Sequence, residues 1–162
     1  MLHTHAKWLS VFLGIVGSVL CQSATADWDY SRWGMTVDQI LSASKGKLRK
    51  CSPTVCRAHA TTTSSAQLYG EFDDGTFTFT IYAFFEHWSG RLSSVELWLW
   101  DVNQTDALVK AMLTKYGEPA RNSNGAIIES YVWRSPTDQI TLLAVRDRRA
   151  STTVTYRPGD AP

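Results

Sequence analysis

The chain has 162 residues and carries 16 Lys and Arg against 15 Asp and Glu, which gives a net charge of +1. A near-neutral charge gives no electrostatic case for nucleic acid or an anionic membrane as the main partner. The length suits one domain of ordinary size with a hydrophobic core.

The first 26 residues have the features of a signal peptide. Residues 8–20 form an apolar run of thirteen, which is shorter than the ~20 residues that a membrane-spanning helix needs. The small residues Ala24, Thr25 and Ala26 follow as a signal-peptidase pattern, and we predict cleavage after Ala26. Lipoprotein processing at Cys21 and an uncleaved anchor are the alternatives. Cleavage would leave residues 27–162 as a single domain in the periplasm or outside the cell, with no transmembrane segment.

Two cysteines, Cys51 and Cys56, remain after the predicted cleavage. An even pair in an exported protein favours a disulfide, and closing so short a loop stabilises the fold by on the order of 2 kcal/mol. A redox centre, or a zinc site completed by His59 and His87, is the alternative, but the spacing matches no familiar pattern of either kind. We therefore predict no metal and no cofactor.

The first predicted helix covers residues 37–45. Thr36 is a suitable N-cap, and Gln39 three residues later completes a capping-box pattern. Gly46 is suited to end the helix. The side chains expected to face the core are Val37, Ile40, Leu41 and Ser44.

Residues 45–57 are predicted to form a loop. They carry five cations, namely Lys45, Lys47, Arg49, Lys50 and Arg57. We interpret them as a solvated loop closed by the cysteine pair, with docking of an acidic partner or a phosphate as the alternative. Residues 58–66 are rich in Ser and Thr and are expected to form a link or the start of a strand.

Residues 67–100 are predicted to form three antiparallel strands. A strand at 67–72 is followed by a turn at residues 73–75, and then by a hairpin at 76–100. A five-residue turn at 86–90 would set Thr80 opposite Glu96 and Thr78 opposite Trp98. One face of the hairpin is apolar and comprises Phe77, Phe79, Ile81, Ala83, Val95, Leu97 and Leu99.

The second half of the chain repeats this order of elements. A helix is predicted at residues 106–116, and Gly117 with Pro119 would end it. Residues 121–125 are expected to be a loop. Strands are predicted at 127–134, 139–145 and 151–157.

The predicted fold is a two-layer α+β domain built from tandem α-βββ units, with an antiparallel sheet and the helices on one face. The other face of the sheet is then left to water or to a partner.

Two stretches carry a resemblance to known families. WGMTVDQI, at residues 33–40, resembles the helix start of the small outer-membrane lipoprotein of the barrel-assembly machinery, and ALVKAMLTKYGEPA, at 107–120, is similar to a pattern of exported bacterial proteins. The order of elements resembles the beta-lactamase-inhibitor-protein fold. The resemblance implies a non-enzymatic protein that binds another protein across its open sheet, and it carries no functional residue over to this chain.

The second face of the hairpin holds more aromatic side chains than a solvated face needs. We predict a binding patch there, made of Tyr82, Phe84, Trp88, Trp98 and Trp100. Its ligand would be a protein or another cell-envelope component, including a glycan whose sugar rings stack on the aromatics. Alternatively, these side chains strengthen the sheet, lie under residues 28–33 or pack against a second copy of the chain.

No catalytic residue is predicted. The side chains that an enzyme could use are His59, His87, Glu86, Glu96, Asp73 and Asp74, and their spacing fits no nucleophile, acid-pair or metal arrangement. The predicted function is therefore binding, and inhibition of an envelope enzyme would be one form of it. A small envelope hydrolase with an unrecognised site is the alternative.

Overall fold

The computed structural model describes residues 28–147 and 150–159. The predicted signal peptide and Cys21 lie outside the described residues. Within the described part of the chain, no helix is both long enough and apolar enough to cross a membrane.

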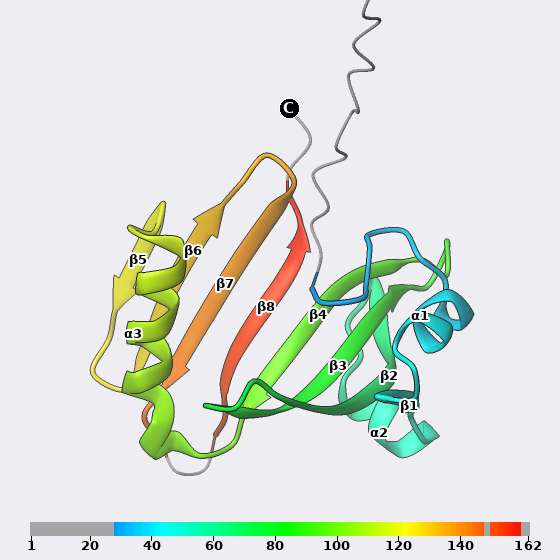
Figure 1. Cartoon of the computed structure of the whole chain (residues 1–162), viewed down its shortest axis with the longest axis horizontal. Helices are drawn as coiled ribbons and strands as arrows, with labels where there is room; N and C mark the ends of the chain where they lie inside the picture. Colours follow the sequence, from blue (N-terminus) through cyan, green and yellow to red (C-terminus); the bar gives the residue numbers. More distant parts are fainter. Residues whose placement is uncertain (1–27, 148–149, 160–162) are drawn as a thin grey trace, which may run out of the picture.

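The fold is one eight-stranded antiparallel sheet in the order β1-β2-β3-β4-β8-β7-β6-β5 (Figure 1). The strands are β1 (Leu48–Lys50), β2 (Ser64–Asp73), β3 (Thr78–Glu86), β4 (Leu92–Leu99), β5 (Arg121–Asn124), β6 (Ile128–Arg134), β7 (Asp138–Val145) and β8 (Thr152–Pro158). The predicted α+β class with an antiparallel sheet is confirmed. The prediction of six strands was wrong, because the short edge strands β1 and β5 lack the apolar alternation that marks a strand in a sequence.

Helices α1 (Val37–Ala43) and α3 (Thr105–Tyr116) lie on the same face of the sheet, which we call the inner face (Figure 1). The predicted capping box begins α1, since the Thr36 side chain accepts from the Gln39 N–H and the Gln39 side chain accepts from the Thr36 N–H. A short 3-10 helix, η1 (Val102–Gln104), leads into α3. As predicted, α3 ends at Gly117, whose φ of 73° suits glycine.

A third helix, α2 (Pro53–Ala58), occupies the predicted cationic loop and lies on the opposite face, which we call the outer face. The predictions of a plain loop and of helices on one face only were therefore wrong. The local signal was present, because Ser52 is an N-cap that accepts from the Val55 N–H and Pro53 is the first helical residue. With the order α1-β1-α2-β2-β3-β4-α3-β5-β6-β7-β8, the tandem arrangement of α-βββ units stays a prediction.

The main core lies between the inner face and the segments that cover it. Residues 28–33, which we call the lead-in segment, run between α1 and α3 (Figure 1). Trp28 is buried and packs edge-on against Phe72, with ring centroids 5.2 Å apart. The indole N–H of Trp33 donates to Asp138 Oδ1 over 2.9 Å. The lead-in segment therefore completes the inner layer instead of covering the outer aromatics.

The register of the β3–β4 hairpin differs from the prediction by two residues. Thr80 lies opposite Trp98, whereas the prediction set it opposite Glu96. The turn, residues 86–91, is one residue longer than predicted, and a bulge beside Phe84 adds a second residue. Because a shift of two keeps every side chain on its face, the predicted division into apolar and aromatic faces is retained.

The close approach of β1 to β2 predicts that Gly70→Ala destabilises the protein. A Cβ at Gly70 would overlap the carbonyl oxygen of Lys47 and lie 2.8 Å from Leu48 Cδ2. We expect the free energy of unfolding in urea to fall by about 1–3 kcal/mol, as for other overpacked sites. The exposed neighbour provides the control, because Glu71→Ala should change it by less than about 0.5 kcal/mol. Equal stability of the two variants would contradict the close approach.

Candidate functional site

The predicted aromatic patch divides into a covered part and an exposed part. Tyr82 and Phe84 are only 8% and 4% exposed. With Ala66 they form a second, smaller core on the outer face, against which Val55 of α2 packs. The ring of His59, at the end of α2, stacks on Tyr82 with centroids 4.0 Å apart. The chain itself therefore covers this part, and the covering segment is α2 with His59.

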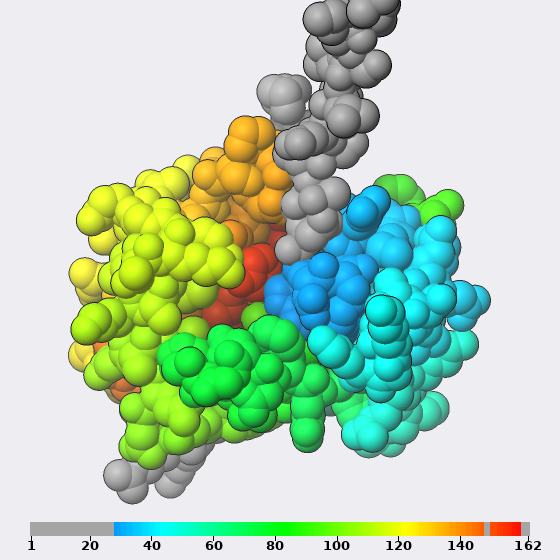
Figure 2. Space-filling model, viewed as in Figure 1, coloured from blue at the N-terminus to red at the C-terminus, as the bar shows by residue number. Residues whose placement is uncertain are grey.

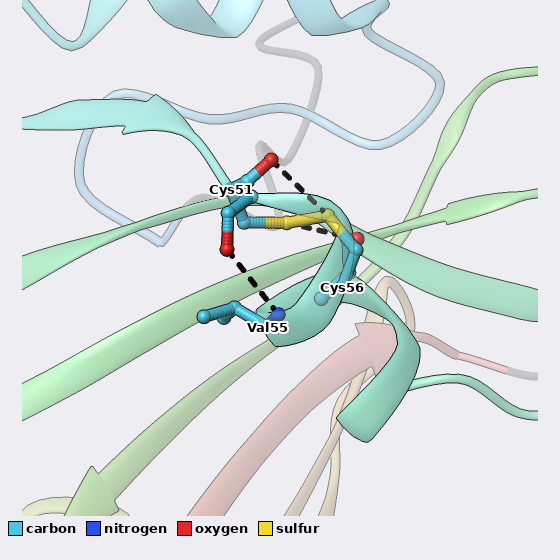
Figure 3. Close-up of a disulfide and its surroundings, with 5 residues drawn as sticks. Cys51, Val55 and Cys56 are labelled. Carbon is cyan, nitrogen blue, oxygen red and sulfur yellow. Dashed lines mark hydrogen bonds between the residues drawn. A yellow bond between two sulfur atoms is a disulfide. The ribbon is translucent and has the colours of Figure 1, made fainter.

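The predicted disulfide between Cys51 and Cys56 holds that cover in place (Figure 3). Cys51 is fixed to the sheet, because its N–H donates to the Gln67 carbonyl of β2 over 3.0 Å. Cys56 lies within α2, and the two Cα atoms are 5.7 Å apart. The bond thus ties a six-residue helix, too short to be stable alone, to the edge of the sheet.

The exposed part consists of Trp98, which is half-buried, and Trp100, which is 57% exposed. Both indole N–H groups are already bonded within the chain. Trp98 Nε1 donates to Glu96 over 2.9 Å and Trp100 Nε1 donates to Thr80 over 3.0 Å. The rings lie 5.6 Å apart and are tilted by 45°. What they offer a ligand is therefore a fixed aromatic surface, not a hydrogen-bond donor.

Trp88 does not join this surface. It is 79% exposed and lies in the turn between β3 and β4. Trp100 follows the far end of β4, so the length of the hairpin separates the two side chains. The five residues predicted as one patch are thus two buried side chains, a pair made of the half-buried Trp98 and the exposed Trp100, and an isolated tryptophan.

The tryptophan pair continues into an outward-facing row across the second half of the sheet. In this row Trp98 pairs with Thr153, Thr153 with Leu143, and Leu143 with Ser130. Leu143 is 38% exposed. We call Trp98, Trp100, Thr153 and Leu143 the tryptophan strip. The alternation of side chains along β7 and β8 could have indicated that Leu143 and Thr153 face the same side of the sheet. That β8 pairs with β4, which brings them beside Trp98, has no signal in the sequence.

A shallow polar groove of about 360 Å³ lies beside the strip. Hydroxyl groups and the charged residues Glu86, Glu96 and Arg157 line it, together with Phe84. The groove adds polar groups to the rim of an aromatic surface, as in many binding sites.

The side chains that an enzyme could use have separate places. His59 lies against Tyr82 and Trp98, whereas His87 is exposed in the β3–β4 turn. Asp73 and Asp74 accept backbone N–H groups of the β2–β3 turn, the first from Gly75 and the second from Thr76 and Phe77. Among residues 28–147 and 150–159, no group of three or more His, Cys, Asp and Glu side chains could hold a metal ion.

Burial lowers the pKa of His59 below its ordinary value, and the nearby carboxylate of Glu96 opposes that shift. Desolvation disfavours the charged imidazolium, so the neutral ring is the form that stacks on Tyr82.

Removing the disulfide should loosen α2 before the rest of the fold. We expect Cys51→Ala/Cys56→Ala to lower the free energy of unfolding by about 2 kcal/mol, which is the value for a loop of this length. Hydrogen exchange should accelerate at the amides of α2 and remain slow in α3. Unchanged exchange in α2 would show that packing alone holds the helix.

Acidification should destabilise the protein through His59. Because its pKa is lower in the folded state, the unfolded chain takes up the proton first, so stability is full above the unfolded value of ~6.5 and falls as the pH drops below it. We expect the free energy of unfolding, measured in urea, to fall between pH 7 and pH 5. His59→Phe keeps an aromatic ring on Tyr82 and should remove the part of this fall that is due to His59. His87→Phe should retain it. An unchanged pH dependence in His59→Phe would rule out this role.

A comparison with protein-family models found no match, and comparisons with curated proteins and with solved structures found none either. The function therefore rests on the side chains of the outer face and their geometry.

Proposed function

We propose that the protein is an exported, non-enzymatic binding protein of the cell envelope that contacts a partner protein through the tryptophan strip. The observation that carries the proposal is the 57% exposure of Trp100 beside Trp98, with both indole nitrogens bonded within the chain. An exposed large aromatic side chain held in one orientation is costly to leave in water and is well suited to a partner.

Physical considerations support a protein partner. Tryptophan is enriched at the few positions that dominate binding energy. A ring that is already fixed loses little conformational entropy when the partner arrives. The row through Thr153 and Leu143 extends the contact area along neighbouring strands, with the polar groove at its edge.

Export is supported by two features. The N-terminal sequence has the pattern of a signal peptide, and the described residues contain a disulfide, which persists in oxidising compartments. The resemblance to inhibitor-type exported proteins points in the same direction and adds inhibition of an envelope enzyme as one form of the function.

A glycan is the second ligand that the outer face favours. Thr153 lies opposite Trp98, and Thr155 lies opposite Glu96 on the same two strands. Sugar rings are bound by aromatic stacking together with hydrogen bonds to their hydroxyl groups. An experiment can distinguish the two ligands, because a protease degrades a protein and a muramidase degrades a glycan.

Trp100→Ala should weaken partner binding without unfolding the protein. We expect capture of the partner from envelope extract to weaken at least about 30-fold, as for a residue worth about 2 kcal/mol. The free energy of unfolding should change by no more than about 1 kcal/mol, because the ring is largely exposed and the substitution removes one exposed hydrogen bond to Thr80 and the contact with the ring of Trp98. Trp88→Ala removes an equally large exposed ring outside the strip and should leave capture unchanged.

A photo-crosslinking side chain at position 100 identifies the class of ligand. A product that protease destroys supports the protein partner, whereas a product that only muramidase destroys replaces it with a glycan. Full capture by folded Trp100→Ala would contradict the proposed surface.

A further inference from the structure

A cleft opens on the inner face, away from the tryptophan strip. It lies between α3 and the lead-in segment, and β8 is visible at its floor between them (Figure 2). Its volume is about 330 Å³. Most of its lining is apolar, with Trp28, Phe79, Leu97, Leu108, Met112 and Val154 as the main contacts.

The lining of the cleft distinguishes it from the groove on the outer face, which has a similar volume but is lined mainly by hydroxyl and charged groups. Cavities of about 300–1,000 Å³ with a mostly apolar lining and a few polar groups are typical of small-molecule sites.

Two tyrosine hydroxyls lie among the apolar side chains of the cleft. Tyr116 of α3 and Tyr156 of β8 both line it, and their oxygens are 3.3 Å apart. One hydroxyl donates to the other, so a second proton remains for a ligand. Burial and the neighbouring Tyr116 raise the pKa of Tyr156 far above its ordinary value, and its hydroxyl therefore stays protonated.

The charged groups at the mouth are already engaged within the chain. Asp29 forms an ion pair with Lys47 over 3.4 Å. One oxygen of Asp74 accepts two backbone N–H groups in the β2–β3 turn. The ammonium of Lys115 lies 5.0 Å from the ring centre of Tyr116. Asp74 and Lys115 carry opposite charges, and the charge of Asp29 is balanced by Lys47. A charged ligand would therefore lose its hydration without meeting a net counter-charge.

We propose that this cleft binds a neutral, largely apolar small molecule carrying one carbonyl or hydroxyl oxygen. The apolar body lies against Trp28, Leu108 and Met112, and the oxygen accepts the spare proton of the Tyr116–Tyr156 pair. This site is independent of the tryptophan strip, which lies on the other face of the sheet.

Three naphthalenes of similar shape test the proposal by equilibrium dialysis with the whole protein. 2-Acetylnaphthalene carries the oxygen, 2-ethylnaphthalene lacks it, and 2-naphthoate is charged. We expect both neutral compounds to bind, and 2-naphthoate to bind at least about tenfold more weakly than 2-acetylnaphthalene. Tyr116→Phe/Tyr156→Phe removes both hydroxyls and keeps the rings. It should weaken 2-acetylnaphthalene about fivefold and leave 2-ethylnaphthalene unchanged.

Substitutions on α3 locate the bound compound. Ala111 is exposed and lines the cleft, so Ala111→Trp should block the mouth and abolish binding of both neutral compounds. Ala107→Trp, at an exposed position one turn earlier, should leave their affinities unchanged. The proposal is overturned if neither neutral compound binds, if Ala111→Trp retains their binding, if 2-naphthoate binds as tightly, or if the double tyrosine variant affects both neutral compounds alike.

Discussion

The antiparallel pairing of β4 with β8 is the contact on which the rest of the structure depends. Each of these strands ends a run of four strands, and their pairing joins the two runs into one sheet. On the inner face the pair Leu97 and Val154 belongs to the core and lines the cleft. On the outer face the pair Trp98 and Thr153 forms the centre of the tryptophan strip. Both candidate binding surfaces therefore lie back to back on the same two strands.

The two faces of the sheet are covered by different means. On the inner face, α1, α3 and the lead-in segment bury a large continuous core, so hydrophobic packing is sufficient there. On the outer face, α2 has only six residues and buries little. Its N-cap, the disulfide and the stacking of His59 on Tyr82 together compensate for that small contact. The additional aromatic side chains of β3, Tyr82 and Phe84, thus belong to a second small core, and the tryptophan strip beyond it faces solvent.

Much of the fold could be predicted because its signals are local. Thr36 and Gln39 mark the start of α1, Gly117 marks the end of α3, and alternation assigns the hairpin side chains to their faces. Contacts between distant segments have no such signal. Polar β5 is a strand only because β6 pairs with it, and the bulge beside Phe84 depends on the neighbouring strands. For the same reason, the stacking of His59 on Tyr82 could not be predicted. The start of α2 could have been, because Ser52 and Pro53 are local signals of a helix start.

The position of β8 also determines the order in which the sheet can form. β8, the last strand among the described residues, lies in the middle of the sheet, where it pairs with β4 on one side and β7 on the other. Joining such distant segments requires closure of a long loop, which is slow compared with hairpin formation. A chain that ends before residue 152 would expose two long, unpaired edges, and such edges pair readily with other chains. The complete sheet can therefore form only after residues 152–158 are available to pair with both β4 and β7.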